Sequence, residues 1–194
     1  CIRRVWLDKH QPTAAGPDAF NQLLSDFGLE HEATMLARLE HQYPVSKAIS
    51  FEHTQALMQQ GAAVIYQGRL VDERQGLAGY PDFLIRHDSG YYQPADAKLS
   101  LSENKRAIQI QLGIYRRLLG NNLPALVFLG DGRTAQLGDE VEPLVDEFIT
   151  GMRALLDLPQ PPAVRYSHSK CRICPHVAVC RPEFETKEDI SLLY

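Results

Sequence analysis

The chain has 194 residues, enough for one compact domain with a buried apolar core, or for one domain with a small appendage. Hydrophobic residues make up 44% and charged residues 23%, and no apolar run reaches the length of a transmembrane helix. The net charge of -4 excludes an overall basic surplus, so a nucleic-acid partner would have to be bound by a local basic patch. This composition predicts a soluble globular protein.

The chain begins at Cys1 rather than at a methionine and shows no signal peptide, so we expect a piece of a longer protein. Three of its four cysteines cluster near the end, which favours an intracellular metal site over a secreted disulfide framework. We therefore expect a reducing, cytoplasmic compartment and no membrane partner.

Apolar residues recur at helical spacing in the first part of the chain. The positions i, i+3, i+4 and i+7 hold Phe20, Leu23, Leu24 and Phe27. This stripe predicts a helix over residues 17–42, with Asp18 as its N-cap and Gly28 as a candidate break. A shorter helix is predicted over residues 51–60.

The middle of the chain changes to a strand pattern. Three runs rich in β-branched and aromatic residues predict successive strands over 63–71, 80–86 and 91–98. The elements expected after them are a helix over 105–119, a buried strand over 124–129, a helix over 141–156 and a stiff linker over 159–162. This order predicts an α/β fold with a central mixed β-sheet flanked by helices.

Two acidic residues stand at the ends of the predicted hairpin formed by the second and third strands. Asp82 follows Pro81, while Asp96 and Lys98 are two apart and share one face of a strand. Carboxylate oxygens suit Mg²⁺ or Mn²⁺, and a neighbouring lysine can steady the attacking hydroxide. A D-x-K pair alone is more often a solvated ion pair, but the preceding Pro-Asp at a hairpin's distance favours the metal site.

Three segments together resemble the signature of the RecB family of PD-(D/E)XK nucleases. They are Gly79-Tyr80-Pro81-Asp82, Asp96-Ala97-Lys98 and Gln111-Leu112-Gly113-Ile114-Tyr115. The resemblance implies a restriction-endonuclease-like core in which Asp82, Asp96 and the Ala97 carbonyl bind metal. It also implies that Lys98 positions water and that Gln111 and Tyr115, at i and i+4 on one helix face, position DNA.

The family also has a histidine ligand on an upstream helix, and Gly28-Leu29-Glu30-His31 resembles that element. His31 is therefore the expected ligand, with His53 as its main rival. Glu32 would point about 100° away around the helix, so we interpret it as a supporting or structural carboxylate. Many family members carry Glu where this chain has Asp96, which implies a shifted metal preference.

The cysteines have the spacing of a chelating loop. Cys171, Cys174 and Cys180 form a C-x₂-C-x₅-C pattern, and Cys1 is the only other cysteine. Four thiolates suit a [4Fe-4S] cluster, and the alternatives are a structural zinc ion or unliganded buried cysteines. The pattern also resembles the iron-sulfur subgroup of RecB-like nucleases, which includes AddB-type and CRISPR-associated exonucleases. This resemblance implies a structural cluster that joins the two ends of the chain.

These interpretations give a nuclease core over residues 1–158, with Cys1 reaching the cluster, and an iron-sulfur element and tail over 159–194 in the same structural domain. The leading hypothesis is a metal-dependent DNA exonuclease acting on single strands or duplex ends, fused to or associated with a helicase or nuclease module. The first alternative is a catalytically quiet DNA-binding or assembly module, and the second is a zinc-binding interaction domain.

Candidate surfaces for DNA lie around both motifs. The basic residues that could contact phosphates are Lys98, Lys105, Arg106, Arg116 and Arg117 near the acidic motif, and Arg3, Arg4, Lys170, Arg172 and Arg181 near the cysteines. The aromatic residues that could stack on bases are Tyr91, Tyr92 and Tyr115. For any one of them, a solvated charge or a packed ring is the simpler interpretation.

Overall fold

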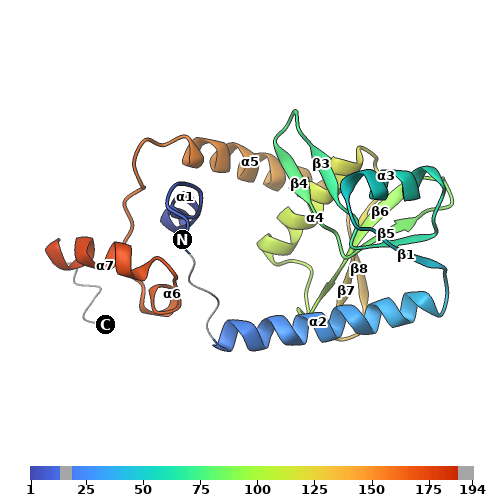
Figure 1. The fold of residues 1–194 in the computed structure, drawn as a ribbon, viewed down its shortest axis with the longest axis horizontal. Helices are drawn as coiled ribbons and strands as arrows, with labels where there is room; N and C mark the ends of the chain where they lie inside the picture. Colours follow the sequence, from blue (N-terminus) through green and yellow to red (C-terminus); the bar gives the residue numbers. More distant parts are fainter. Residues whose placement is uncertain (14–18, 188–194) are drawn as a thin grey trace. The chain divides into compact units, whose positions relative to one another are not determined.

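The computed structural model describes residues 1–13 and 19–187 (Figure 1). The chain divides into two compact units. The larger unit covers Ser25–Phe148 and holds the acidic motif, whereas the smaller unit combines Cys1–Leu24 with Ile149–Tyr194 and holds all four cysteines. Within the described residues, no helix is both long enough and apolar enough to span a membrane.

A six-stranded mixed sheet forms the centre of the larger unit. Its strands, in spatial order, are β1 (Val45–Lys47), β2 (Val64–Tyr66), β5 (Phe83–Arg86), β6 (Tyr92–Lys98), β7 (Ala125–Leu129) and β8 (Thr134–Leu137). The pairs β1–β2 and β6–β7 are parallel and the other pairs are antiparallel. The predicted α/β class with a mixed central sheet is confirmed.

Helices cover both faces of this sheet. On one face, Met35 and Leu39 of α2 (Ala19–Glu40) pack against Phe83 and Ala95. The opposite face is covered by α4 (Arg106–Leu119), whose Leu112 belongs to the core cluster around β7, and by α3 (Phe51–Gln59). The unit also contains the short helix η1 (Asp139–Val141) and the first part of α5 (Glu142–Leu156), as far as Phe148. The sheet is therefore covered by α2 on one face and by α4 and α3 on the other. Along β6, Ala95 and Ala97 face α2, whereas Asp96 pairs with Val127, which belongs to the cluster on the α4 side.

Two details differ from the sequence prediction. The expected break at Gly28 is wrong, because α2 continues through Gly28 without interruption, while the predicted cap Asp18 lies outside the described residues. The expected strand over 63–71 is divided at Gln67, whose φ of 53° is in the left-handed region. The chain then leaves the main sheet and forms a separate two-stranded ribbon, β3 (Leu70–Asp72) with β4 (Leu77–Gly79).

The smaller unit is built around a helix that the sequence pattern did not reveal. The Trp6 indole of α1 (Ile2–His10) donates to the Leu158 carbonyl at 2.9 Å. The buried Arg3 donates to the Pro162 carbonyl at 2.8 Å and forms an ion pair with Glu183 of α7 (Val177–Thr186). These contacts tie the first residues of the chain to the segment that carries the cysteines, which also includes the short helix α6 (His168–Cys171).

Candidate functional site

Asp82 and Asp96 are held side by side by each other's strands. The pairing of Phe83 with Ala95 places Asp82, just before β5, opposite Asp96 on β6. The Asp82 amide donates to Asp96 Oδ1 at 2.9 Å, and the Ala97 amide donates to Asp82 Oδ2 at 2.8 Å. Backbone amides thus fix one oxygen of each carboxylate, and the backbone of Ala97 lies beside both.

The second oxygen of Asp96 is buried against a single cation. The Asp96 side chain is only 1% exposed, and its Oδ2 lies 2.8 Å from the Lys98 ammonium nitrogen. Apart from this ammonium, no donor of the described residues reaches Oδ2. A buried carboxylate oxygen in this state is suited to a cation ligand.

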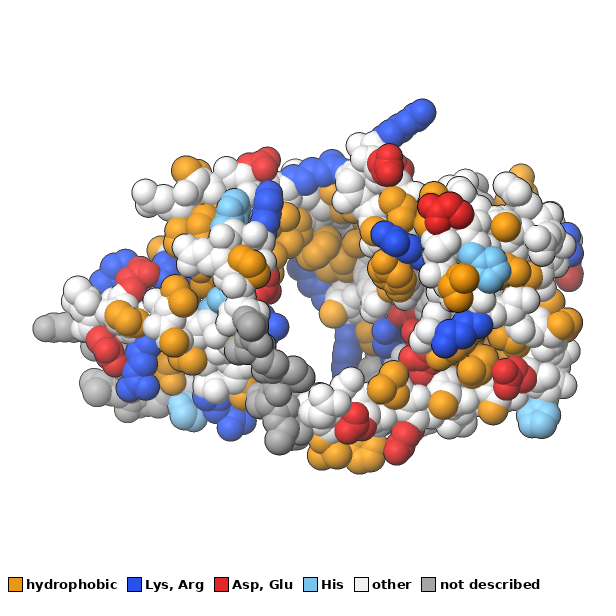
Figure 2. Space-filling view, viewed as in Figure 1, with side chains coloured by type: hydrophobic (Ala, Val, Ile, Leu, Met, Phe, Trp, Pro, Cys, Tyr) orange, Lys and Arg blue, Asp and Glu red, His pale blue; other side chains and the backbone are white. Residues whose placement is uncertain are grey.

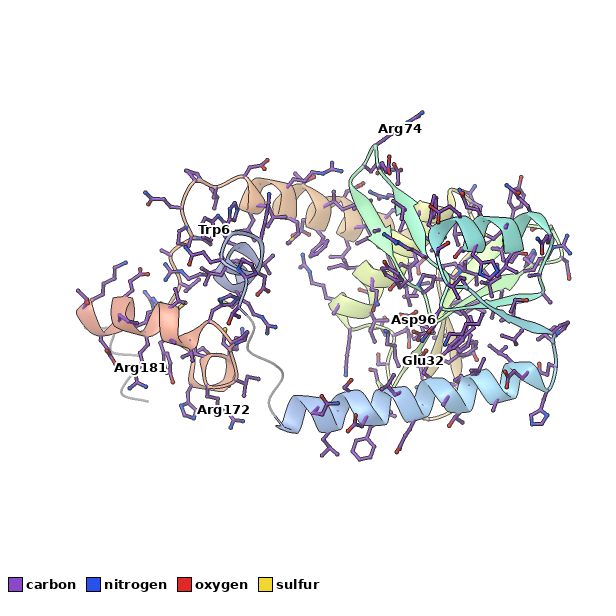
Figure 3. All side chains as sticks on the ribbon, viewed as in Figure 1. Trp6, Glu32, Arg74, Asp96, Arg172 and Arg181 are labelled. Carbon is purple, nitrogen blue, oxygen red and sulfur yellow. The ribbon has the colours of Figure 1, made fainter. Side chains whose placement is uncertain are left out.

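A third carboxylate, Glu32, approaches the pair from α2 (Figure 3). Gln67 Nε2 donates to Glu32 Oε1 at 3.1 Å, and the Gln67 amide donates to the Asp82 carbonyl at 2.8 Å. Gln67, with its left-handed backbone, therefore links Glu32 to the strand that carries Asp82. Sequence reasoning had given Glu32 only a supporting role, because the neighbouring His31 matched the family pattern.

His31, the neighbouring residue on α2, contacts the backbone of β7. Its Nε2 is 3.0 Å from the Phe128 carbonyl of β7, and Phe128 pairs with Ala97 of β6. One ring nitrogen is thereby engaged by the backbone, and no interaction of His31 with Asp82 or Asp96 is found in the described chain. The rival His53 lies on α3, which packs on the face of the sheet opposite to α2.

Burial and mutual repulsion make the carboxylates hard to ionise without a cation. Burial, followed by the charge of Asp96, raises the pKa of Asp82 to about 7, and Glu32 adds to this shift. Burial also raises the pKa of Asp96, although the Lys98 ammonium opposes the shift. Three carboxylates facing one lysine leave a surplus of negative charge, which a divalent cation would neutralise.

Gln111 and Tyr115 brace the segment that precedes Asp82. Gln111 Nε2 donates to the Tyr115 hydroxyl at 2.8 Å, and this hydroxyl donates to the Tyr80 carbonyl at 3.2 Å. The ring packs so closely on Gly79 that a Cβ there would lie 2.5 Å from Tyr115 Cε1. Burial, followed by the charge of Asp96, raises the pKa of Tyr115. The structure thus gives this pair a positioning role, with the tyrosine ring buried.

Several of the candidate phosphate contacts are engaged within the protein. Arg116 is 3% exposed and is bound by Asp139 and Glu142, while Arg117 is bound by Glu142 and Asp146. These arginines hold α4 against the segment that begins α5 and are not available to DNA. The candidates that stay exposed and have no ion pair among the described residues are Lys105, Lys170 and Arg172.

All four cysteines line one small pocket of the smaller unit. The other residues around this pocket are Arg4, Leu7, Val164, Lys170, His176, Val177 and Phe184. Burial raises the pKa of the Cys180 thiol, and the nearby Cys174 and Cys171 add to the shift, whereas the Arg3 guanidinium opposes it. The Ser167 amide donates to Cys171 Sγ at 3.4 Å. The Arg3 guanidinium and the Ser167 amide would each stabilise a thiolate at one of these sulfur atoms, whereas burial without a bound cation favours the neutral thiol of Cys180.

The two candidate sites differ in their donor atoms. Within residues 1–13 and 19–187, no group of three or more His, Cys, Asp or Glu side chains has a geometry that could hold a metal ion. The donor sets nevertheless match two different chemistries, since the acidic site offers the carboxylate oxygens of Asp82, Asp96 and Glu32 and the cysteine pocket offers four thiols.

Comparisons with known proteins assign no family. No family model and no curated protein matches the chain. A solved structure named as the crystal structure of SSO0001 is similar at 15% identity and a TM-score of 0.37, covering 93% of this chain and 81% of that chain. A similarity of this degree defines neither family nor activity, so the argument for function depends on the site geometry.

Proposed function

We propose that this chain is a divalent-metal-dependent DNA nuclease with a PD-(D/E)XK-type site, and that its cysteines hold a structural [4Fe-4S] cluster. The observation that carries the proposal is the buried Asp96 carboxylate, which lies between Asp82 and Lys98 and whose Oδ2 meets no described donor except the Lys98 ammonium. The order Pro-Asp, then Asp-x-Lys across a hairpin, supports the same assignment.

The ligands for the catalytic metal are Asp82, Asp96 and the Ala97 carbonyl, with Glu32 or His31 completing the set from α2. Mg²⁺ or Mn²⁺ bound by such oxygen ligands lowers the pKa of its water and neutralises charge on the phosphate. Asp82 and Asp96 require little rearrangement to serve as ligands, because backbone amides already fix one oxygen of each.

Lys98 acts on the attacking water and the phosphate. Its ammonium is partly exposed and lies 2.8 Å from Asp96, so it can reach both the carboxylate and solvent at the site. Its positive charge stabilises a hydroxide and the charge that develops on the phosphate oxygens. Gln111 and Tyr115 hold the Tyr80 carbonyl and thereby fix the approach to Asp82.

In the smaller unit, a cluster held by Cys1, Cys171, Cys174 and Cys180 would join α1 to the segment of α6 and α7. The contacts of Arg3 and Trp6 already bring these segments together. The proposed partner is DNA with single-stranded or duplex ends, together with a fused or associated helicase or nuclease module, and the proposed mode of cutting is exonucleolytic.

The test is cleavage of end-labelled single- and double-stranded DNA by anaerobically purified protein with Mg²⁺ or Mn²⁺. We expect cleavage to be lost in Asp96→Ala and Lys98→Ala and retained in Asp88→Asn, which alters an exposed carboxylate in the β5–β6 turn. DNA binding without cleavage under either metal would instead identify a catalytically quiet DNA-binding module.

Two further measurements separate the ligand choices. Mn²⁺ affinity, measured by electron paramagnetic resonance, should fall more in Glu32→Gln than in His31→Ala if the carboxylate is the ligand from α2. Absorbance near 400 nm together with iron and sulfide analysis should report about four iron atoms per chain. A colourless protein with bound zinc would contradict the iron-sulfur assignment.

A further inference from the structure

An exposed aromatic side chain stands next to the acidic site and is unused by the chemistry proposed above. Tyr80 is 57% exposed and precedes Asp82 by two residues. The Arg69 guanidinium lies over its ring, with Cζ 5.6 Å from the ring centroid. An exposed ring of this size contributes little to the core.

The backbone that carries this pair is held rigidly. The Tyr115 hydroxyl donates to the Tyr80 carbonyl, and Gly79 is packed against the Tyr115 ring. The Arg69 amide donates to Thr54 Oγ1 at 2.9 Å, and Thr54 is fully buried. The ring and the guanidinium are therefore presented to solvent from a fixed frame, which reduces the entropy that a ligand must overcome on binding.

We propose that Tyr80 and Arg69 form a stacking platform for a nucleobase of single-stranded DNA beside the scissile phosphate. The proposal rests on the nuclease function and names its preferred substrate. Tyr80 and Asp82 are two residues apart, so their backbones lie within about 7 Å of each other, which is about two base steps of a strand. A base stacked on the ring would thus place a nearby phosphate at the carboxylates.

The chemistry of the pair selects an unpaired base. Aromatic rings bind any base through its π-face, and a guanidinium adds cation-π attraction and charge for a phosphate. The bases of an intact duplex are already stacked on one another, so they can reach the ring only at a frayed or single-stranded end. The platform therefore favours single strands and ends over internal duplex DNA.

The experiment compares Tyr80→Ala and Tyr80→Trp with Tyr43→Ala in the full chain. Tyr43 is a matched control because it is 45% exposed and lines a pocket with Arg86 and His87, at the end of β5 away from Asp82. Binding is measured with a single-stranded oligonucleotide containing 2-aminopurine, with Ca²⁺ as the divalent ion, and KM and kcat are measured with Mg²⁺.

We expect Tyr80→Ala to weaken single-strand binding by about 5- to 100-fold, to raise KM more than it lowers kcat, and to abolish the change in 2-aminopurine fluorescence. Tyr80→Trp should retain all three properties, and Tyr43→Ala should behave as the wild type.

If Tyr80→Ala binds single-stranded DNA as tightly as the wild type, and the wild type cleaves DNA, the platform is refuted. The nuclease function is then retained. An equal loss on single strands and internal duplex would also refute it, because it would indicate a structural role. A wild type that neither binds nor cuts DNA would overturn both proposals.

Discussion

Replacing Asp82 with asparagine should stabilise the metal-free protein at neutral and alkaline pH, although it should weaken metal binding. The pKa of Asp82 is raised from its ordinary 3.8 to about 7 by burial and by the charge of Asp96. Because the folded-state pKa is the higher one, this carboxyl favours folding at low pH and opposes it increasingly as pH rises from about 4 to about 7. The full penalty above pH 7 corresponds to about 4 kcal/mol. Asparagine removes the charge and keeps an oxygen for the Ala97 amide.

The assay is urea and thermal unfolding of both proteins in EDTA between pH 5 and pH 8. The stability of Asp82→Asn relative to wild type should increase by about 2 to 3 kcal/mol over this range, or roughly 5 to 10 °C in Tm. Saturating Mn²⁺ should then stabilise the wild type far more than the variant. A difference that does not change with pH, or a variant that is less stable at pH 8, would refute the reasoning that Asp82 is an electrostatically strained carboxylate.

Three other substitutions test separate parts of the structure. Gly79→Ala forces a Cβ to within 2.5 Å of the Tyr115 ring, so it should cost about 1 to 3 kcal/mol in urea unfolding and reduce DNA cleavage more than Mn²⁺ affinity. Gly28→Ala, at a helical glycine with no described atom within 4 Å of the added Cβ, should stabilise the protein by about 0.5 to 1 kcal/mol; a loss of stability would show that the site is not an open helix face. Cys174→Ser should lower the iron content and the absorbance near 400 nm while leaving Mn²⁺ binding at Asp96 intact, and unchanged iron would remove Cys174 from the proposed ligand set.

The parts of the fold that follow a clear period could be predicted from the sequence. The hairpin of β5 and β6 has a turn-forming segment between two apolar runs, and α4 has a strong apolar face capped by Gly120. The sequence pattern does not predict α1, because the buried Arg3 interrupts the apolar pattern of this helix. The ion-pair partner of Arg3 is Glu183, which is 180 residues away in the chain. Contacts of such range leave no local signal in the chain.

Two local signals were overridden by tertiary structure. The helix-breaking tendency of Gly28, worth about 1 kcal/mol, is outweighed because Met35 and Leu39 anchor the same helix to the sheet. The segment from Val64 to Leu70 reads as one strand in the sequence, yet Gln67 adopts a left-handed conformation. Its amide is bonded to the Asp82 carbonyl, so the break belongs to the construction of the acidic site.

The residue that α2 contributes to the acidic site could not be chosen from the sequence. Met35 and Leu39 fix the buried face of the helix, and at 100° per residue positions 31 and 32 fall on either side of that face. His31 accordingly reaches Phe128 on β7, whereas Glu32 reaches Gln67 after β2. In the sheet order β2-β5-β6-β7, the strands that carry the two aspartates lie between these contacts. A motif specifies which helix approaches the site, but the rotation of that helix is set by its packing. Glu32, whose charge already acts on both aspartates, therefore has at least as strong a structural claim as His31.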